Sequence, residues 1–469
     1  MREQIMEERF DVAVIGGGPA AIFACWEFSV SHPELSVVML EEGNPVDRRF
    51  CPLAAGKSDH CLRCVPCAIM RGFGGAGAFS DGKYNFTTEF GGWLTEYLPK
   101  KTVMDLIDYV DQVNYSHGAP GETFTTKNST IGRLALGYDL HLLNGKVRHL
   151  GTENNLKIME NIFLELREKI EIRCNTKVHS FAKEGDEFVL ETSGGTVRST
   201  YLIAAPGRAG AEWFMEEGRK LGLNFANNAV DVGVRVEVPA AVFKHITDEV
   251  YEAKLMYRTK QYNDLVRTFC MNPNGYVVAE NTDGIVTVNG HSFADPQKQS
   301  ENTNFALLVS NKFTEPFKEP HQYGKRIASF SNLLGGGVLL QRFGDLIKGR
   351  RTNERRLAKS FTRPTLSATP GDLSLVLPKR QLDDLIEMIY ALDKIAPGMA
   401  NDDTLLYGVE VKFYSSRPEL DANLETKISG LFAVGDGAGI TRGLSQASAS
   451  GVYVAREIGR RIAKQSEKV

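Results

Sequence analysis

Runs of apolar residues alternate with polar segments along the chain, and the first run is the most informative. Residues 10–15 (FDVAVI) are almost continuously apolar, as expected for a parallel strand that is covered on both faces. Three glycines and a proline (residues 16–19) interrupt this run, and an apolar helical segment follows. A second apolar run, residues 36–41, ends in an acid. This order predicts a β-strand, a glycine-rich turn, an α-helix and a second parallel strand.

The glycine turn has the spacing of the dinucleotide-binding fingerprint G-x-G-x-x-G/A. Gly16 allows the tight turn, and Gly18 lets the backbone approach a pyrophosphate. Ala21 is small enough for the helix to pack closely on the strand. Glu41, at the end of the second strand, is placed to accept hydrogen bonds from ribose hydroxyls, and its carboxylate disfavours the 2′-phosphate of NADP. This segment therefore predicts a nucleotide-binding site.

A second nucleotide-binding pattern lies near the C-terminus. Residues 431–434 predict a short strand, and Gly435 and Asp436 follow at its carboxyl end. A helical pattern then runs from about Leu444 towards residue 462. Glycine and other small residues in this segment, among them Gly443, allow a close approach to a flat ligand.

These two ends of the chain resemble the glutathione-reductase-type flavoprotein superfamily. The resemblance implies that Asp436 hydrogen-bonds the ribityl chain of FAD, and that the helix start at Gly443, Leu444 and Ser445 faces the flavin. It also implies that the backbone at Val178 contacts the adenine. FAD, rather than NAD, is therefore the expected nucleotide. Because the sequence has no second strand–GxGxxG–helix unit, a dedicated NAD(P)H domain is not expected.

The length of 469 residues favours two domains over one. We predict an α/β fold in which a discontinuous, Rossmann-type FAD-binding domain like that of glutathione reductase comprises residues 1–95, 145–210 and 425–469. Residues 211–424 form a mixed α+β domain on the substrate side. A cysteine-rich insertion, residues 51–67, interrupts the first domain.

Four cysteines in this insertion have the spacing C-x9-C-x2-C-x2-C: Cys51, Cys61, Cys64 and Cys67. Such thiolates resemble the ligands of a 4Fe–4S iron–sulfur cluster. They can equally hold structural zinc, although zinc sites more often pair two arms across a longer spacer. As a third interpretation, they are redox-active thiols that exchange electrons with a flavin. The spacing leaves these alternatives open.

A glycine-rich loop, residues 72–83 (GFGGAGAFSDGK), follows the cysteines. This loop resembles that of the uncharacterised FAD-dependent dehydrogenases with a G-G-A-G-x-F-S-D-G-K signature. Matching segments follow in order at residues 230–239 and 287–293 and near the C-terminus, so the likeness covers nearly the whole chain. In related folds this loop lies beside the flavin, which implies that Gly75 contacts the cofactor.

Two side chains are candidates for catalysis. Lys83 either stabilises an anionic reduced flavin or forms a surface ion pair with Asp81. His291 is either a general acid or base, or a hydrogen-bonded core residue. Arg235 and Glu237 share one face of a predicted strand, where they are expected to clamp each other or a substrate carboxylate.

Composition narrows the choice of partners and location. The 55 Lys and Arg residues against 58 Asp and Glu residues give a net charge of −3, which favours neither nucleic acid nor an anionic membrane. The charged N-terminus is not a signal peptide, and no apolar stretch is long enough to cross a bilayer. We therefore expect a cytoplasmic protein.

The expected function is that of an FAD-dependent oxidoreductase, a dehydrogenase or reductase. It would transfer electrons between a small organic substrate and a redox partner, which would be a ferredoxin-like protein if the cysteines hold an iron–sulfur centre. One alternative is a flavin-dependent RNA-modifying enzyme, which would require a basic face that this sequence does not show. Another is a flavoprotein whose FAD is structural or sensory.

Overall fold

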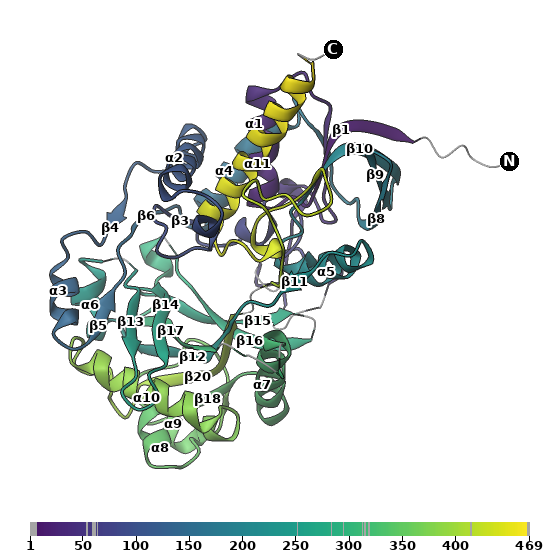
Figure 1. The fold of residues 1–469 in the computed structure, drawn as a ribbon. Coiled ribbons are helices and arrows are strands. Elements are labelled where there is room, and N and C mark those ends of the chain that lie inside the picture. Colours follow the sequence, from purple (N-terminus) through teal and green to yellow (C-terminus); the bar gives the residue numbers. More distant parts are fainter. Residues whose placement is uncertain are drawn as a thin grey trace. The chain divides into compact units, whose positions relative to one another are not determined.

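The computed structural model divides into two compact units (Figure 1). The first unit comprises residues 1–123, 147–228 and 414–469, and the second comprises residues 124–146 and 229–413. The described residues are 7–52, 55–58, 62, 64–250, 252–282, 284–293, 295–311, 313, 316–317, 319–412 and 415–466. The units change at 228/229 and 413/414, whereas the sequence placed these boundaries at 210/211 and 424/425. Residues 96–144, which the sequence left unassigned, contribute to both units.

A seven-stranded sheet forms the centre of the first unit, with the order β7-β2-β1-β10-β9-β8 and with β22 also paired to β10. Its parallel strands are β1 (Glu8–Ile15), β2 (Val37–Leu40), β7 (Glu171–Arg173), β10 (Gly195–Ala204) and β22 (Leu431–Ala433). An antiparallel extension adds β8 (Val178–Glu184) and β9 (Glu187–Thr192). The predicted α/β fold class is confirmed, because β1 and β2 pair in parallel and α1 (Pro19–Ser31) lies between them in the chain.

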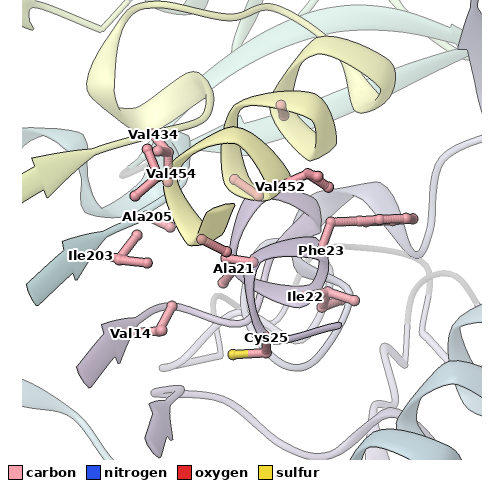
Figure 2. Close-up of a cluster of buried hydrophobic side chains, with 14 of the residues drawn as sticks. Val14, Ala21, Ile22, Phe23, Cys25, Ile203, Ala205, Val434, Val452 and Val454 are labelled. Carbon is pink, nitrogen blue, oxygen red and sulfur yellow. The ribbon is translucent and has the colours of Figure 1, made fainter. Parts of the chain in front are cut away.

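Helices from the two ends of the chain cover this sheet together. In Figure 1, α1 lies beside the C-terminal helix α11 (Leu444–Ser466). Figure 2 shows the core that they share with the strands, where Ala21 and Val452 lie between the helices and Val14 projects from β1. The contact is close: a Cβ at Gly451 would lie 2.0 Å from the carbonyl oxygen of Ala20. Glycine at this position therefore allows the two helices to pack this closely.

The second unit is built on an eight-stranded sheet of order β19-β18-β20-β12-β17-β14-β13-β5. The strands are β5 (Leu140–Leu142), β12 (Val230–Pro239), β13 (Leu255–Arg258), β14 (Leu265–Asn272), β17 (Asn302–Asn311), β18 (Leu339–Arg342), β19 (Thr369–Pro370) and β20 (Leu405–Lys412). On one face, alternate valines of β12 pack in a core with α6 (Ala240–Thr247) and α10 (Lys379–Asp393). The residues between these valines, including Asp231, Arg235 and Glu237, belong to the opposite face.

The other elements connect or extend these two sheets. The remaining helices are α2 (Lys100–Ser116), α3 (Thr130–Leu136), α4 (Thr152–Leu166), α5 (Ala211–Lys220), α7 (Pro320–Gly335), α8 (Phe343–Ile347) and α9 (Glu354–Leu357). The remaining strands are β3 (Lys83–Asn85), β4 (Phe124–Thr125), β6 (Lys146–His149), β11 (Phe225–Ala226), β15 (Tyr276–Thr282), β16 (Ile285–His291) and β21 (Arg417–Pro418). Within the described part of the chain, none of the helices has the length and apolar character needed to cross a membrane.

Candidate functional site

The glycine turn after β1 has the backbone geometry that the fingerprint requires. Gly16 has φ +102°, and a Cβ there would lie 2.2 Å from the carbonyl oxygen of Ala205. Gly18 is the N-cap of α1, and a Cβ at this position would meet no atom within 4 Å. Ala21 is fully buried against the sheet. The turn therefore leaves open space at the N-terminus of α1, where backbone N–H groups favour an anion.

Glu41 holds three glycine-rich segments together. One carboxylate oxygen accepts from the backbone N–H of Gly17 at 2.6 Å. The other accepts from Gly43 at 2.8 Å and from Gly72 at 2.7 Å. The residue is 6 % exposed, so these donors replace most of the water that it would bind in the unfolded chain. A carboxylate has about four lone-pair sites, and three N–H donors leave capacity for a ribose hydroxyl. The sequence predicted the acid but not this anchoring role.

The glycine-rich loop packs directly on the glycine turn. The N–H of Gly74 donates to the carbonyl oxygen of Gly17 at 2.7 Å. A Cβ at Gly75 would lie 3.0 Å from the Cα of Gly18, and one at Gly77 would lie 2.7 Å from the Cδ2 of Leu444. The structure thus brings three predicted positions together: the start of α1, Gly75 and the start of α11.

Arg49 holds the start of this loop and the residues just before it. The sequence analysis did not identify this role. Its guanidinium donates to the carbonyl oxygens of Ala68, Ile69 and Phe73 at 2.8–3.0 Å, and it lies 4.7 Å from the ring centroid of Phe79. Burial lowers the pKa of Arg49 to about 10, and the nearby carboxylate of Glu41 opposes that shift. Because its partners are backbone carbonyl groups, no spacing of side-chain types could have identified it.

The C-terminal motif forms a second tight turn in the same unit. Gly435 has φ +77°, and Asp436 accepts hydrogen bonds from the Thr441 hydroxyl at 2.7 Å and from the Gly443 N–H at 3.2 Å. A Cβ at Gly443 would meet no atom within 4 Å. The hydroxyl of Ser445 is buried without a hydrogen-bond partner among the described residues. Asp436 therefore fixes the entry to α11, where space and an unused polar group are found.

Val178 lies where the antiparallel extension begins. It is the first residue of β8, is 7 % exposed, and pairs with Thr192 of β9. Two residues earlier, the N–H of Thr176 donates to the carbonyl oxygen of Glu41 at 2.8 Å. The chain leading into Val178 therefore runs beside the predicted ribose-binding acid, and an adenine contact at Val178 stays a prediction.

These features fit a bound dinucleotide. Open space adjoins Gly18 and Gly443, and buried polar groups such as the Ser445 hydroxyl normally have a partner. The turns at Gly16 and Gly435 carry the positive φ values that such tight approaches need. All of these positions belong to the first unit.

Lys83 and His291, the two catalytic candidates, have defined neighbours. Lys83 forms an ion pair with Asp81 at 2.9 Å, and His149 lies 3.9 Å from the same carboxylate. The Lys83 side chain is only 9 % exposed, so this pair is buried and not on the surface. His291 ends β16 and is half-buried, with its ring edge-on to Phe293 at 4.8 Å. Neither arrangement identifies a catalytic role.

Arg235 and Glu237 do not clamp each other, so that part of the expectation is wrong, whereas a contact with a substrate carboxylate stays a prediction. Arg235 pairs with Glu410 of β20 at 3.3 Å and donates to the side-chain oxygen of Asn304 at 2.7 and 2.9 Å. Glu237 instead accepts from the Tyr407 hydroxyl at 2.6 Å. Burial and Glu237 raise the pKa of Tyr407 well above its ordinary value. Both long side chains reach neighbouring strands, which a pattern along one strand cannot reveal.

Of the four clustered cysteines, three are described and Cys61 lies outside the described residues. Cys51 and Cys67 are half-buried and Cys64 is exposed, and all three are free thiols. Among the described residues, no three His, Cys, Asp or Glu side chains are grouped closely enough to hold a metal ion. The four-cysteine centre therefore stays a prediction, and no electron-transfer step is assigned to it.

Comparison with known proteins relates the second unit to a family. Residues 229–413 match the family model described as "FAD-dependent protein, C-terminal domain-like". An uncharacterized protein of Clostridium beijerinckii (strain ATCC 51743 / NCIMB 8052) is 26% identical over 471 residues, covering 95% of this chain and 80% of that protein. Over residues 229–413, this match agrees with the resemblance to FAD-dependent proteins that the sequence indicated.

Solved structures with a similar course of the chain are distant. Glycine oxidase from Geobacillus kaustophilus is 12% identical with a TM-score of 0.38, and the alignment covers 97% of this chain and 95% of that one. L-proline dehydrogenase from P. horikoshii is 11% identical with a TM-score of 0.42 and the same coverage.

Proposed function

We propose that this chain, whose residues 229–413 match the C-terminal domain-like model of FAD-dependent proteins, is an oxidoreductase that transfers electrons between a small organic substrate and a redox partner. When bound, FAD supplies the redox chemistry, and the protein binds and orients it. The observation that carries the proposal is the convergence of the glycine turn, the glycine-rich loop and Glu41 in one hydrogen-bonded assembly.

Each part of this assembly has a role in binding the nucleotide. The N–H groups at the start of α1 receive the pyrophosphate beside Gly18, where the helix dipole favours negative charge. Glu41 accepts from the adenosine ribose, and Asp436 accepts from the ribityl chain. Ser445, at the start of α11, donates its buried hydroxyl to the flavin. The partial positive charge of that helix end stabilises negative charge on the reduced ring.

The cofactor assignment is tested by releasing the bound flavin and identifying it by chromatography. We expect FAD, not FMN, at one per chain. Gly18→Val and Asp436→Ala should each lower this ratio. Gly121→Val is the matched control, because a Cβ at Gly121 also meets no atom within 4 Å. Gly121 is far in sequence from both the glycine turn and the C-terminal motif. FMN or no flavin would overturn the proposal, and full FAD retention in both variants would overturn these residue assignments.

We further propose that the cysteine segment carries a metal centre, and that the redox partner is then a ferredoxin-like protein. The support is the spacing of Cys51, Cys61, Cys64 and Cys67, and the proximity in sequence of the loop that packs on Gly18. Anaerobic purification should give iron and sulfide, with broad absorbance that dithionite bleaches. Cys64→Ser should remove this absorbance and leave FAD bound, whereas the control Cys174→Ser should change neither.

Other outcomes of the same measurement decide between the alternatives. Zinc without iron or sulfide would make the segment a structural clip. Absence of metal, together with two thiols lost on oxidation, would make it a redox dithiol. An unchanged spectrum in Cys64→Ser would overturn the metal centre.

A further inference from the structure

Cations are concentrated in one segment of the second unit, residues 342–363, which includes α8 and α9. The segment contains eight of them: Arg342, Lys348, Arg350, Arg351, Arg355, Arg356, Lys359 and Arg363. Two carboxylates, Asp345 and Glu354, belong to the segment, and two more, Asp402 and Asp403, form ion pairs with it. Eight positive and four negative charges leave a local net charge of +4, whereas the whole chain has a net charge of −3. The other residues of the chain therefore carry −7 together.

Four of the cations hold the segment in place through three of the carboxylates. Asp345, which is fully buried, accepts from the Nε atoms of Arg350 at 2.8 Å and of Arg356 at 3.1 Å. The other two pairs are Arg342 with Asp403 and Lys348 with Asp402. These contacts use half of the positive charge for local structure, and the other half is not used in this way.

The other four cations are exposed, and none of them forms an ion pair with a described residue: Arg351, Arg355, Lys359 and Arg363. Local contacts show that they are close neighbours. The guanidinium of Arg363 donates to the carbonyl oxygen of Ala358 at 3.0 Å, which places it beside Lys359. Arg355 and Lys359 are four residues apart along α9 and the turn that follows it. Against these four cations, the segment has one exposed acid without an ion pair to a described residue, Glu354.

Phe361 lies in the chain between Lys359 and Arg363, and its ring is held in water. The side chain is 81% exposed, whereas its neighbours Ser360 and Thr362 are buried. The N–H of Phe361 donates to the carboxylate of Asp403 at 2.9 Å, which fixes the backbone. A partner that covers this ring removes apolar surface from water, which favours binding. We call the five residues Arg351, Arg355, Lys359, Phe361 and Arg363 the basic face.

We propose that the basic face binds a short acidic segment of a partner protein. Aspartate or glutamate carboxylates of that segment pair with the four cations, three of which are arginines that can bind a carboxylate through two parallel hydrogen bonds. An apolar side chain of the same segment covers Phe361. A long polyanion such as a nucleic acid fits less well, because beyond the basic segment it would meet residues with a net charge of −7. This interaction goes beyond the proposed function and does not depend on it.

The test is a fluorescence anisotropy titration of the holoprotein at low salt with a labelled heptapeptide of glutamates around a central tryptophan. A peptide with glutamines in place of the glutamates is the neutral comparison. We expect the acidic peptide to bind at least about tenfold more tightly, because each exposed ion pair contributes up to about fivefold. The triple substitution Arg351→Gln, Arg355→Gln and Lys359→Gln should weaken its binding by at least about tenfold. These three side chains form no ion pair or hydrogen bond with a described residue, so the fold should be unaffected.

The matched control removes the same amount of charge from exposed cations elsewhere in the second unit. It combines Lys127→Gln just before α3, Arg133→Gln in α3 and Arg326→Gln in α7. This variant should bind the acidic peptide like the parent. Phe361→Ala is the second test variant, and it should weaken binding of the tryptophan-containing peptide about two- to tenfold. Binding of an acidic peptide with a central glycine should not change in Phe361→Ala.

Three outcomes would overturn this inference. The first is equal binding of the glutamate and glutamine peptides, and the second is an equal loss of affinity in the triple variant and its control. The third is a labelled twelve-nucleotide oligouridylate that binds more tightly than the acidic peptide and is released by the triple substitution, which would assign the basic face to nucleic acid. The flavin content of the same preparations tests the proposed function separately.

Discussion

Two buried carboxylates, Glu41 in the first unit and Glu410 in the second, are stabilised in different ways. Glu41 accepts three hydrogen bonds from backbone N–H groups of glycine-rich turns. Glu410 is neutralised by the side chains of Arg235 and Lys412 at 3.3 and 2.8 Å. Backbone donors carry no net charge, so the charge of Glu41 is left to act on the nearby Arg49 guanidinium and on a ligand. Glu410 shares its charge with two cations and serves the packing of its own sheet.

The largest expected effect is the loss of a buried cation from the second unit. Arg235→Met leaves Glu410 with Lys412 alone and removes the donors to Asn304. Removing one partner of a buried ion pair costs about 3–5 kcal/mol. The free energy of unfolding, measured with urea, should fall by that amount, while FAD per folded chain stays constant. Arg258→Met, on an exposed residue of β13, is the control. A loss below about 1 kcal/mol would contradict the assigned role of the pair.

The same contrast explains what the sequence could predict. The partners of Glu41 belong to short segments with recognisable patterns, so the strand, the turn and the terminal acid were all predicted. Arg235 and Glu410 are 175 residues apart, and a register shift at Gly233/Val234 changes which residue of β20 lies opposite each position. Such pairing depends on the assembled sheet, and no pattern along β12 contains it.

Arg49 and the unit boundaries show the same limit. Arg49 binds carbonyl groups of residues 68, 69 and 73, which every residue type offers, so the side chains around it carry no signal. The boundary at 228/229 falls just before β12, whose alternating valines belong to the second core. The predicted boundary was drawn from the nucleotide-binding motifs, so it fell earlier in the chain.

The second largest expected loss of stability comes from removing the Glu41 carboxylate, which accepts from Gly17, Gly43 and Gly72. Glu41→Ala leaves three buried N–H groups without their acceptor, and each such loss costs about 1–3 kcal/mol before water or relaxation compensates. We expect a loss of about 2–4 kcal/mol in the free energy of unfolding, with FAD retention falling and no switch in preference between NADH and NADPH. A switch would mean that this turn binds a nicotinamide nucleotide.

Glu42→Ala is the neighbouring control for this variant. Glu42 is partly exposed and pairs with Arg71 at 3.1 Å, so its removal should cost less than about 1 kcal/mol. If Glu41→Ala and Glu42→Ala lower the free energy of unfolding equally, the three backbone hydrogen bonds to Glu41 contribute no more to stability than an exposed ion pair.

A third buried carboxylate, that of Asp384, differs from Glu41 and Glu410 because its neighbour Asp264 is another acid. Asp384 is fully buried on α10, and burial together with Asp264 raises its pKa from 3.8 to about 6. Since the folded pKa exceeds the unfolded one, the folded protein loses stability as the pH rises from about 4 to about 6. Asp384→Asn should flatten this decline, which is on the order of 1–3 kcal/mol. Urea midpoints measured between pH 4 and 7 would decide, and parallel curves for both proteins would contradict the assignment.

The smallest expected change in stability comes from adding a methyl group at Gly443. Comparison with Gly451 distinguishes a glycine that leaves space for a ligand from one that allows two helices to pack. Gly443 directly precedes α11 and Gly451 lies about two turns inside it. A Cβ at Gly443 would meet no atom within 4 Å, whereas one at Gly451 would lie 2.0 Å from the Ala20 carbonyl oxygen. Gly443→Ala also keeps the N–H that donates to Asp436. Its unfolding free energy without flavin should therefore change by less than about 0.5 kcal/mol. Gly451→Ala should instead destabilise the protein by forcing α1 and α11 apart.

If FAD occupies the space at Gly443, the added methyl group will raise the dissociation constant for FAD although the fold is unaffected. Unchanged FAD affinity in Gly443→Ala would show that the cofactor does not approach this turn.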